Sequence, residues 1–314
     1  MIRRTLLAGA ALALALPPGT AAANGLDFSA HLPVWRIGII GGENEADRLR
    51  RLSCLAELVT ERFAIPVELY PATDYAGVMQ GLIAGTLEVA GLGASAYAGI
   101  HLQDPNAVEV IVTNSNTDDS LGYYSVVVVR ADSGIDDMEQ LRGRSLAFAD
   151  PNSASGYLVP HFELNDQGYT TDGGNRFFGQ VGFSGGHEQG VIAVLNRQYD
   201  AAATWMSGLG ERSDGYSRGN LRRMVDKGAL DMDDIEIVWT SSLIANGPTV
   251  IRQDLPAEVK EAYTDFLVGL VDEHPDCYAN LAGGDGNGYV RIDHSFYEPM
   301  VHMRRATMDA RRGG

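Results

Sequence analysis

The sequence predicts an α/β protein made of two α/β lobes, and three observations support this fold class. Residues 34–92 alternate between short apolar runs and helical patterns in the order β-α-β-α-β, which is typical of a parallel sheet with crossover helices. The same alternation restarts after residues 126–129, a run of valines that favours a buried strand. About 290 residues follow the N-terminal leader, a length that suits two domains of roughly 100–200 residues each.

The first α/β unit is defined by hydrophobic spacing and helix caps. In chain order, it is expected to contain a strand over 34–40, a helix over 45–63, a strand over 65–70, a helix that ends near residue 84 and a strand over 89–92. Leucines recur every three residues from 49 to 58 and mark the buried face of the first helix. Thr73 and Asp74 are suited to cap the second helix, because their side-chain oxygens accept hydrogen bonds from N–H groups of a first turn.

The second unit repeats this organisation. It is expected to contain strands over 126–129, 145–149, 199–204 and 235–239, and helices over 136–141, from Ser155 onward and over 187–198. The part that follows Pro256 is expected to be mainly helical, most clearly over 258–271.

Two linking segments, near 125–131 and 243–250, are expected to join the units as hinge strands. Lobe 1 is then predicted to comprise 24–128 together with 246–314, and lobe 2 to comprise 129–245. Ligands of open α/β sheets bind at the carboxyl ends of the strands, beside helix N-termini. We therefore expect one ligand cleft between the two lobes.

The first 23 residues have the features of a signal peptide. Arg3 and Arg4 form a positively charged region, residues 6–16 are apolar, and alanines at 21–23 offer a small-residue cleavage site. The apolar run is too short to span a bilayer as a stable helix. The protein is therefore expected to be exported, as a secreted or periplasmic protein, by either the general or the twin-arginine route; a retained N-terminal anchor is the alternative.

Acidic residues dominate the composition. The chain has 41 Asp and Glu against 24 Lys and Arg, a net charge of −17 at pH 7. This balance argues against nucleic acid and anionic membranes as partners. It does not exclude an anionic ligand, because exposed charges are screened over roughly 8–10 Å at moderate salt, and a buried site responds mainly to its own local dipoles.

The two cysteines, Cys54 and Cys277, leave their redox state open. In an oxidising compartment they could form a disulfide, whereas Cys54 lies in a helical pattern that equally suits a packed thiol. No cysteine or histidine spacing is typical of a zinc site, and the sequence indicates neither a metal nor a cofactor.

The most informative segment is 149–160, which lies between an expected strand and an expected helix. Ser153 and Ser155 stand where a helix N-terminus leaves backbone N–H groups without acceptors. Those N–H groups, the helix dipole and the two hydroxyls can together bind an oxyanion. A plain Ser N-cap is the alternative interpretation.

Three further side chains are candidates for the same site. His187 opens a helix after two glycines and can donate to an oxyanion, although a structural histidine would fit the same pattern. Tyr75 follows the Thr73-Asp74 cap, and Tyr123 precedes the valine run, so each could place its phenol at the mouth of the cleft. Taken singly, partial core burial would explain either tyrosine.

These stretches resemble the phosphonate-binding periplasmic proteins of phosphate, phosphite and phosphonate ABC importers. The resemblance covers most of the mature chain. The matching segments are residues 73–78, 122–126, 150–160, 186–188 with 198–200, and 239–244. It implies a type II periplasmic-binding fold, a small phosphorus oxyanion as ligand and an inner-membrane ABC permease as partner. It also implies that the residues that contact the phosphonate oxygens are Tyr75, Tyr123, Ser153, Ser155 and His187.

Three positions depart from the pattern of the family. Ala154 stands where a threonine commonly supplies a hydroxyl, so that only its backbone N–H can contribute. Ser207 and Gly247 align with two acids that hold the ammonium group of aminoethylphosphonate, unless Glu211 or Asp214 substitutes for them. An unpaired ammonium in a closed cleft is costly. We therefore expect Trp205 to wall the cleft for a smaller ligand such as phosphite or methylphosphonate.

Other functions remain alternatives. An enzyme on the same fold, acting on a phosphorylated small molecule, would use Ser153 or Cys54 as nucleophile and His187 as base. Ser184 is a rival nucleophile, because residues 182–186 match Gly-x-Ser-x-Gly. A soluble ligand-sensing partner is a third possibility. The sequence does not fix the ligand among phosphonates, phosphite and phosphate, nor the oligomeric state.

Overall fold

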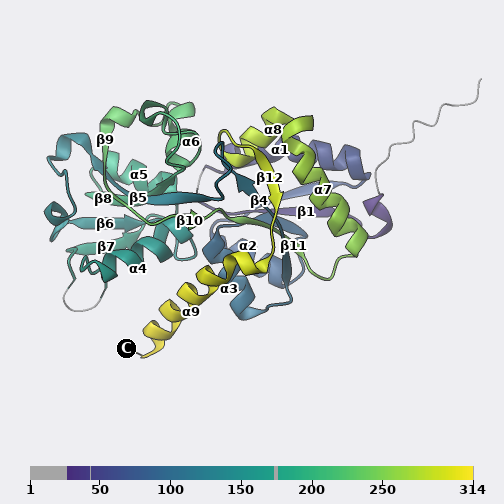
Figure 1. Ribbon diagram of the computed structural model, residues 1–314, viewed down its shortest axis with the longest axis horizontal. Helices are drawn as coiled ribbons and strands as arrows, with labels where there is room; N and C mark the ends of the chain where they lie inside the picture. The colour runs from purple at the N-terminus through teal and green to yellow at the C-terminus, as the bar shows by residue number, and fades with distance from the viewer. Residues whose placement is uncertain (1–26, 43, 173–175, 314) are drawn as a thin grey trace, which may run out of the picture.

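Two β-sheets, each covered by helices, form two lobes that lie side by side (Figure 1). The structure is a computed structural model that describes residues 27–42, 44–172 and 176–313. The signal peptide predicted over 1–23 lies outside these residues. Within the described part of the chain, no helix is both long and apolar enough to cross a membrane.

The sheet of lobe 1 has six strands in the order β12-β4-β11-β3-β1-β2. Their bounds are β1 (Trp35–Ile39), β2 (Val67–Pro71), β3 (Val89–Gly91), β4 (Val108–Ser115), β11 (Pro248–Arg252) and β12 (Gly288–Arg291). Strand β1 pairs in parallel with β2 and β3, as the β-α-β-α-β pattern predicts. Strand β11 returns from lobe 2 and runs antiparallel between β3 and β4.

Helices cover both faces of this sheet. They are α1 (Glu45–Phe63), α2 (Tyr75–Ile83), α3 (Ala94–Gln103), α7 (Ala257–Glu273), α8 (Pro275–Ala282) and α9 (Glu298–Gly313). On one face, Phe28, Trp35, Phe63 and Tyr263 form an aromatic core under α1 and α7. Burial of such large apolar surfaces supplies most of the driving force for folding.

A disulfide joins Cys54 in α1 to Cys277 in α8. The sequence left this pairing open. Because both cysteines lie in lobe 1, the bond links an early helix of this lobe to a late one across 223 positions of the chain.

The sheet of lobe 2 has the order β10-β5-β8-β6-β7, with β9 also paired to β5. The strands are β5 (Gly122–Arg130), β6 (Ser145–Phe148), β7 (Gln180–Phe183), β8 (Ala201–Met206), β9 (Ile235–Thr240) and β10 (Ile244–Ala245). The helices are α4 (Val159–Asp166), preceded by the π-helical turn η4 (Ala154–Leu158), α5 (His187–Leu195) and α6 (Asn220–Asp226). The valines at 126–129 are fully buried in β5, as their β-branched run predicts.

The chain crosses from lobe 1 to lobe 2 after β4 and returns after β10. Strand β5 therefore belongs wholly to the sheet of lobe 2, whereas the predicted boundary at 128/129 lies inside it. The physical reason is that the valine run pairs along its length with β8 and β9 rather than bridging the lobes.

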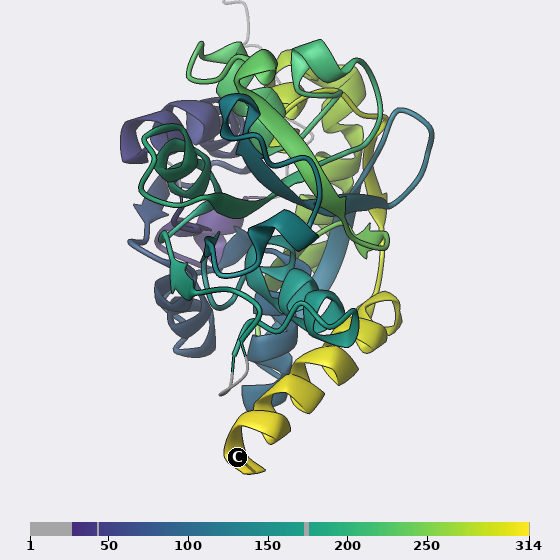
Figure 2. The ribbon, with the colours of Figure 1, turned by 90° about the vertical axis from the view of Figure 1, so that its left-hand side faces the viewer.

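Contacts around the rim hold the two lobes together. Lys227, which follows the last residue of α6, lies 3.5 Å from Asp47 of α1 and also pairs with Glu188 of α5. Helix α9 packs on α3, and its Arg304 donates to Asn152 of lobe 2 at 2.6 Å. Figure 2, which views the molecule from the side of lobe 2, shows α9 running along the lower side of both lobes to the C-terminus.

Candidate functional site

A cavity of about 240 Å³ lies between the lobes and is lined by residues from both. Four helices begin at its wall, because Tyr75 opens α2, Gly93 caps α3, Ser153 caps η4 and His187 opens α5. Each N-terminus carries the positive end of a helix dipole and N–H groups that have no acceptor within the helix itself. The wall therefore attracts an anion, at the strand ends where ligands of α/β sheets bind.

Ser153 and His187 lie together at the lobe 2 side of the cavity. The hydroxyl of Ser153 accepts a hydrogen bond from the Gly156 N–H at 2.9 Å and lies 3.1 Å from Nε2 of His187. A side chain at position 156 would lie 2.5 Å from Cβ of Ala149 and 2.9 Å from Cε1 of His187. Gly156 therefore allows the strand, the turn and the histidine to approach one another.

Ser155 is held by two residues of β5. Its carbonyl oxygen accepts from the Ser125 hydroxyl at 2.6 Å, and its side chain lies beside the Tyr123 phenol. Burial raises the pKa of the Tyr123 phenol, so that the group is a neutral hydrogen-bond donor at physiological pH. Ala154, between the two serines, is also buried and lines the cavity.

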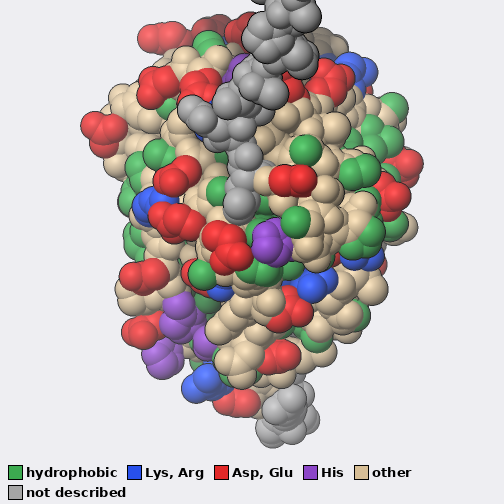
Figure 3. Space-filling model, turned by 90° about the vertical axis from the view of Figure 1, so that its right-hand side faces the viewer, with side chains coloured by type: hydrophobic (Ala, Val, Ile, Leu, Met, Phe, Trp, Pro, Cys, Tyr) green, Lys and Arg blue, Asp and Glu red, His purple; other side chains and the backbone are tan. Residues whose placement is uncertain are grey.

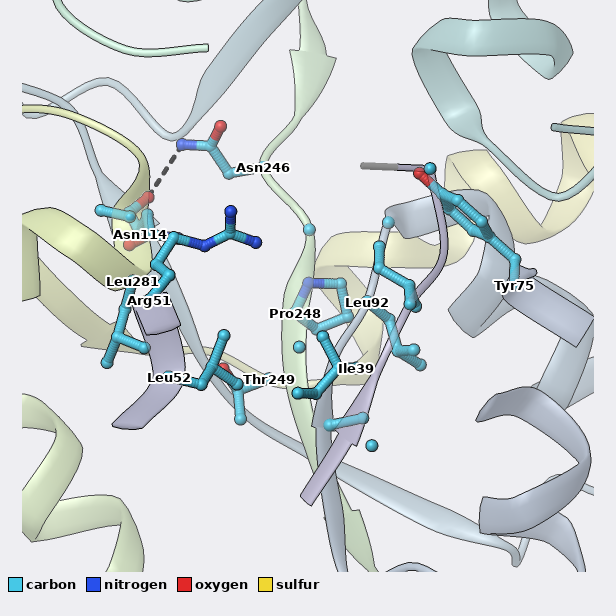
Figure 4. Close-up of a pocket in the computed structure, with 18 of the residues that line it drawn as sticks. Ile39, Arg51, Leu52, Tyr75, Leu92, Asn114, Asn246, Pro248, Thr249 and Leu281 are labelled. Atoms are coloured by element: carbon cyan, nitrogen blue, oxygen red, sulfur yellow. Dashed lines mark hydrogen bonds between the residues drawn. The ribbon is translucent and has the colours of Figure 1, made fainter. Parts of the chain in front are cut away.

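Tyr75 belongs to the lobe 1 side of the cavity (Figure 4). It is buried, and its backbone N–H lies 3.5 Å from Oδ2 of Asp150 in lobe 2. Asp74, as its sequence position predicts, caps α2 by accepting from the Gly77 N–H at 2.9 Å. Burial raises the pKa of the Asp150 carboxyl, although N–H groups of Asn152 and Tyr75 partly oppose this shift.

Of the three positions expected at the cleft wall, Trp205 and Gly247 line the cavity and Ser207 does not. The hydroxyl of Ser207 instead lies 2.9 Å from that of Ser217. A side chain at Gly247 would overlap the carbonyl oxygen of Leu92, so that no acid fits there. Glu211 and Asp214, the suggested substitutes, are exposed and do not line the cavity.

Three arginines that the sequence analysis did not single out also line the cavity: Arg51, Arg218 and Arg223. Arg218 is 4% exposed, and burial lowers the pKa of its guanidinium, which stays charged at physiological pH. A signal was present in the sequence, because Arg218 sits between Ser217 and Gly219 in a Gly-x-Ser-x-Gly string.

The family model for the periplasmic substrate-binding protein of phosphonate ABC transporters matches residues 37–297. The chain belongs to this family. A phosphate-import protein of Mycolicibacterium smegmatis is 28% identical to this binding protein over 229 residues, which cover 71% of this chain and 67% of the relative. The phosphonates-binding periplasmic protein of Escherichia coli is 26% identical over 235 residues, which cover 74% of this chain and 64% of the relative.

Solved structures agree with the fold of the phosphonate-binding family. A binding protein component of an ABC phosphonate transporter from Pseudomonas aeruginosa has a TM-score of 0.73 at 24% identity, covering 86% of this chain and 85% of that chain. A Prochlorococcus marinus protein solved with methylphosphonate has a TM-score of 0.72 at 19% identity, covering 88% and 98%. These matches confirm the predicted α/β fold of the type II periplasmic-binding class with two lobes.

Two of the three nucleophiles considered for an enzyme, Cys54 and Ser184, are engaged elsewhere in this binding protein. Cys54 is bound in the disulfide and cannot act as a nucleophile. The Ser184 hydroxyl lies 3.0 Å from the carbonyl oxygen of Phe148 and 2.8 Å from that of Gly186, and it does not line the cavity. In the described ranges, no group of three or more His, Cys, Asp or Glu side chains is arranged to hold a metal ion.

Proposed function

We propose that this protein is the periplasmic component of an ABC importer that captures a small phosphorus oxyanion between its lobes and delivers it to an inner-membrane permease. One observation carries the proposal: four helix N-termini and the side chains of Ser153, Ser155 and His187 meet at one cavity. Backbone N–H groups, hydroxyls and an imidazole are the donors that a tetrahedral oxyanion requires. The N-terminal leader of residues 1–23 supports export.

Binding in the cleft would close the lobes like a hinged pair, because the ligand contacts both. Tyr75 would close on the oxyanion from lobe 1, and Ser153, Ser155 and His187 would hold it from lobe 2. The closed form, with the ligand enclosed, would then dock on the permease. The family of the chain and the name of its E. coli relative support a phosphonate as the ligand class.

The cavity does not favour an aminoalkyl substituent on the phosphorus. Among its described lining residues none is Asp or Glu, and Gly247 leaves no room for an acid. An ammonium group enclosed there would lack a described counter-charge, which is costly in a buried site. Phosphite, methylphosphonate and phosphonates without an amine are therefore the proposed ligands.

Calorimetric titration of ligand-stripped protein tests the proposal. Methylphosphonate and phosphite should bind more tightly than aminoethylphosphonate. Ser153→Ala should weaken methylphosphonate about tenfold or more, because it removes a hydrogen bond to a charged group. The control is Ser53→Ala, an exposed serine of α1 whose hydroxyl bonds only within its own helix. Equal affinities in the two variants, or tight aminoethylphosphonate binding, would contradict the proposed ligand and site.

A further inference from the structure

Ser153, Ser155 and His187, here called the oxyanion cradle, form one part of the cavity. The cavity also contains a buried positive charge that is not part of this cradle. Arg218 is 4% exposed, and its Nη2 donates to Oδ1 of Asn116 and Oδ1 of Asn246, both at 2.7 Å. Both acceptors are neutral amides. No carboxylate of the described residues forms an ion pair with Arg218, and its Nε has no hydrogen-bond acceptor among them.

A buried guanidinium without a counter-charge is unfavourable, because the protein interior does not replace its hydration. The two amides orient Arg218 but do not neutralise it. Since both belong to the segments where the chain crosses between lobes, the guanidinium is fixed at the base of the cleft. Its charge is therefore directed at whatever molecule enters the cavity.

Two further arginines are part of the surroundings of Arg218. Arg51 and Arg223 line the same cavity, and Figure 4 shows the Arg51 guanidinium extending from lobe 1 toward it. The guanidinium carbons of Arg218 and Arg223 lie 5.8 Å and 5.7 Å from the ring centroid of Trp205. The lining thus contrasts with a chain of net charge −17, whose acidic side chains spread over the outer face of lobe 1 in Figure 3.

Trp205 separates the arginines from the oxyanion cradle. Its ring meets the Tyr123 ring edge-to-face at 5.1 Å, and Tyr123 lies beside Ser155 of the cradle. From one end to the other, the site therefore consists of the cradle, two aromatic rings and the arginines. This arrangement suits a ligand with a phosphonate at one end, a short carbon linker along the rings and a second group beside Arg218.

We propose that this second group is an anion, and that the protein prefers phosphonates with a terminal carboxylate or a second phosphonate. The inference rests on the proposed function, because it assigns the cradle to the phosphonate end. A carboxylate beside Arg218 would supply the missing counter-charge and accept charge-assisted hydrogen bonds. A methyl group at the same place would leave the guanidinium uncompensated, and an ammonium would be repelled.

Titration calorimetry on ligand-stripped protein tests the proposal with a pair of similar size, propylphosphonate and 3-phosphonopropionate. The measured quantity is the ratio of their dissociation constants. The carboxylate should bind about tenfold or more tightly, and Arg218→Gln should bring the ratio close to unity. Arg222→Gln is the matched control, because this neighbouring arginine pairs with Asp226 on the surface of α6 and does not line the cavity.

If Arg218→Gln does not fold, Arg223→Gln provides the second variant and should also lower the ratio. A ratio near unity in the unmodified protein would overturn the anionic subsite, and so would a ratio that both cavity variants leave unchanged. In that case, tight methylphosphonate binding that is lost in Ser153→Ala would leave the proposed function intact. If no phosphorus oxyanion binds at all, the proposed function fails and the subsite with it.

Discussion

At the residue scale, the side chains of the cavity donate hydrogen bonds, and beside them lies one buried carboxyl whose ionisation is unfavourable. The Ser153 hydroxyl is oriented by the Gly156 N–H, and the backbone of Ser155 is held by the Ser125 hydroxyl. Asp150, by contrast, is a buried carboxyl that contacts the N-terminus of α2 across the cleft. Its burial has a consequence for the dependence of stability on pH.

Asp150 should lower the stability of the protein as the pH rises. Burial raises the pKa of its carboxyl above the ordinary value of 3.8, so the folded state binds the proton more tightly than the unfolded state. This contribution to the free energy of unfolding is therefore most favourable below pH 3.8 and is lost as the pH rises through the folded pKa.

Urea unfolding of the unmodified protein and of Asp150→Asn, measured between about pH 3 and pH 7, checks this sign. The difference in unfolding free energy, unmodified minus variant, should decrease toward higher pH. An increase would show that hydrogen bonds to the ionised carboxylate outweigh its burial.

At the scale of elements, the loops that precede α1 and α5 bring the lobes into backbone contact. A side chain at Gly186 would overlap the Cα of Gly42 in the opposite lobe. Gly186 has a φ of 178°, which any residue can adopt. A glycine is therefore required here because of the contact with Gly42, not because of its backbone conformation. The two loops can approach this closely only because both residues are glycines.

Gly186→Ala should therefore weaken ligand binding about tenfold or more by opposing closure, while the melting temperature of the unliganded protein changes little. Titration calorimetry and thermal unfolding measure the two effects. Gly269→Ala in α7 is the control, since its nearest neighbour would be the flexible end of the Glu273 side chain at 3.2 Å. Unchanged affinity in Gly186→Ala would mean that the binding form is more open than the structure described above.

Local patterns predicted most of the elements that build the site. The helical spacing of α1, the caps of α2 and η4 and the valine run of β5 are properties of short segments, and the structure confirms these elements. Strands β4 and β12 were not predicted. Strand β12 has only four residues, Gly288–Arg291, and lies at the edge of its sheet, where its pairing depends on a distant strand.

The site residues also divide into those with a local sequence signal and those whose position depends on the fold. Ser153 and His187 follow local signals, because each stands at the start of a helix. The arginine cluster depends on the fold, which brings Arg51 of α1 to the same cavity as Arg218 and Arg223. No local pattern contains that information. Ser207 was selected by alignment in a segment that is hard to align, and its side chain turns toward Ser217 instead.

At the scale of the whole molecule, an ion-pair group bridges the rim of the cleft. Lys227 of lobe 2 contacts Asp47 of lobe 1 and Glu188 of its own lobe. Its side chain is 28% exposed, so the attraction is partly screened by solvent. These ion pairs favour the closed arrangement, because the pair between Lys227 and Asp47 can form only when α1 and α6 are close.

Lys227→Met should weaken ligand binding by about two- to fivefold, and the loss should shrink as salt is added, because partly exposed ion pairs are worth roughly 0.2–1 kcal/mol. Titration calorimetry at low and high ionic strength measures the change. Lys260→Met is the matched control, since Lys260 pairs with Glu109 inside lobe 1. A similar loss in both variants would contradict a role in closure.

The disulfide between Cys54 and Cys277 gives the chain an unusual connectivity. Lobe 2 lies entirely between the two cysteines, so the bond closes a covalent ring that contains the whole of that lobe and both crossings. The two ends of this ring meet in lobe 1, and the ring closes only after the late helix α8 has reached α1. Once it has closed, a single cut anywhere in lobe 2 leaves both halves of lobe 1 on one covalent molecule.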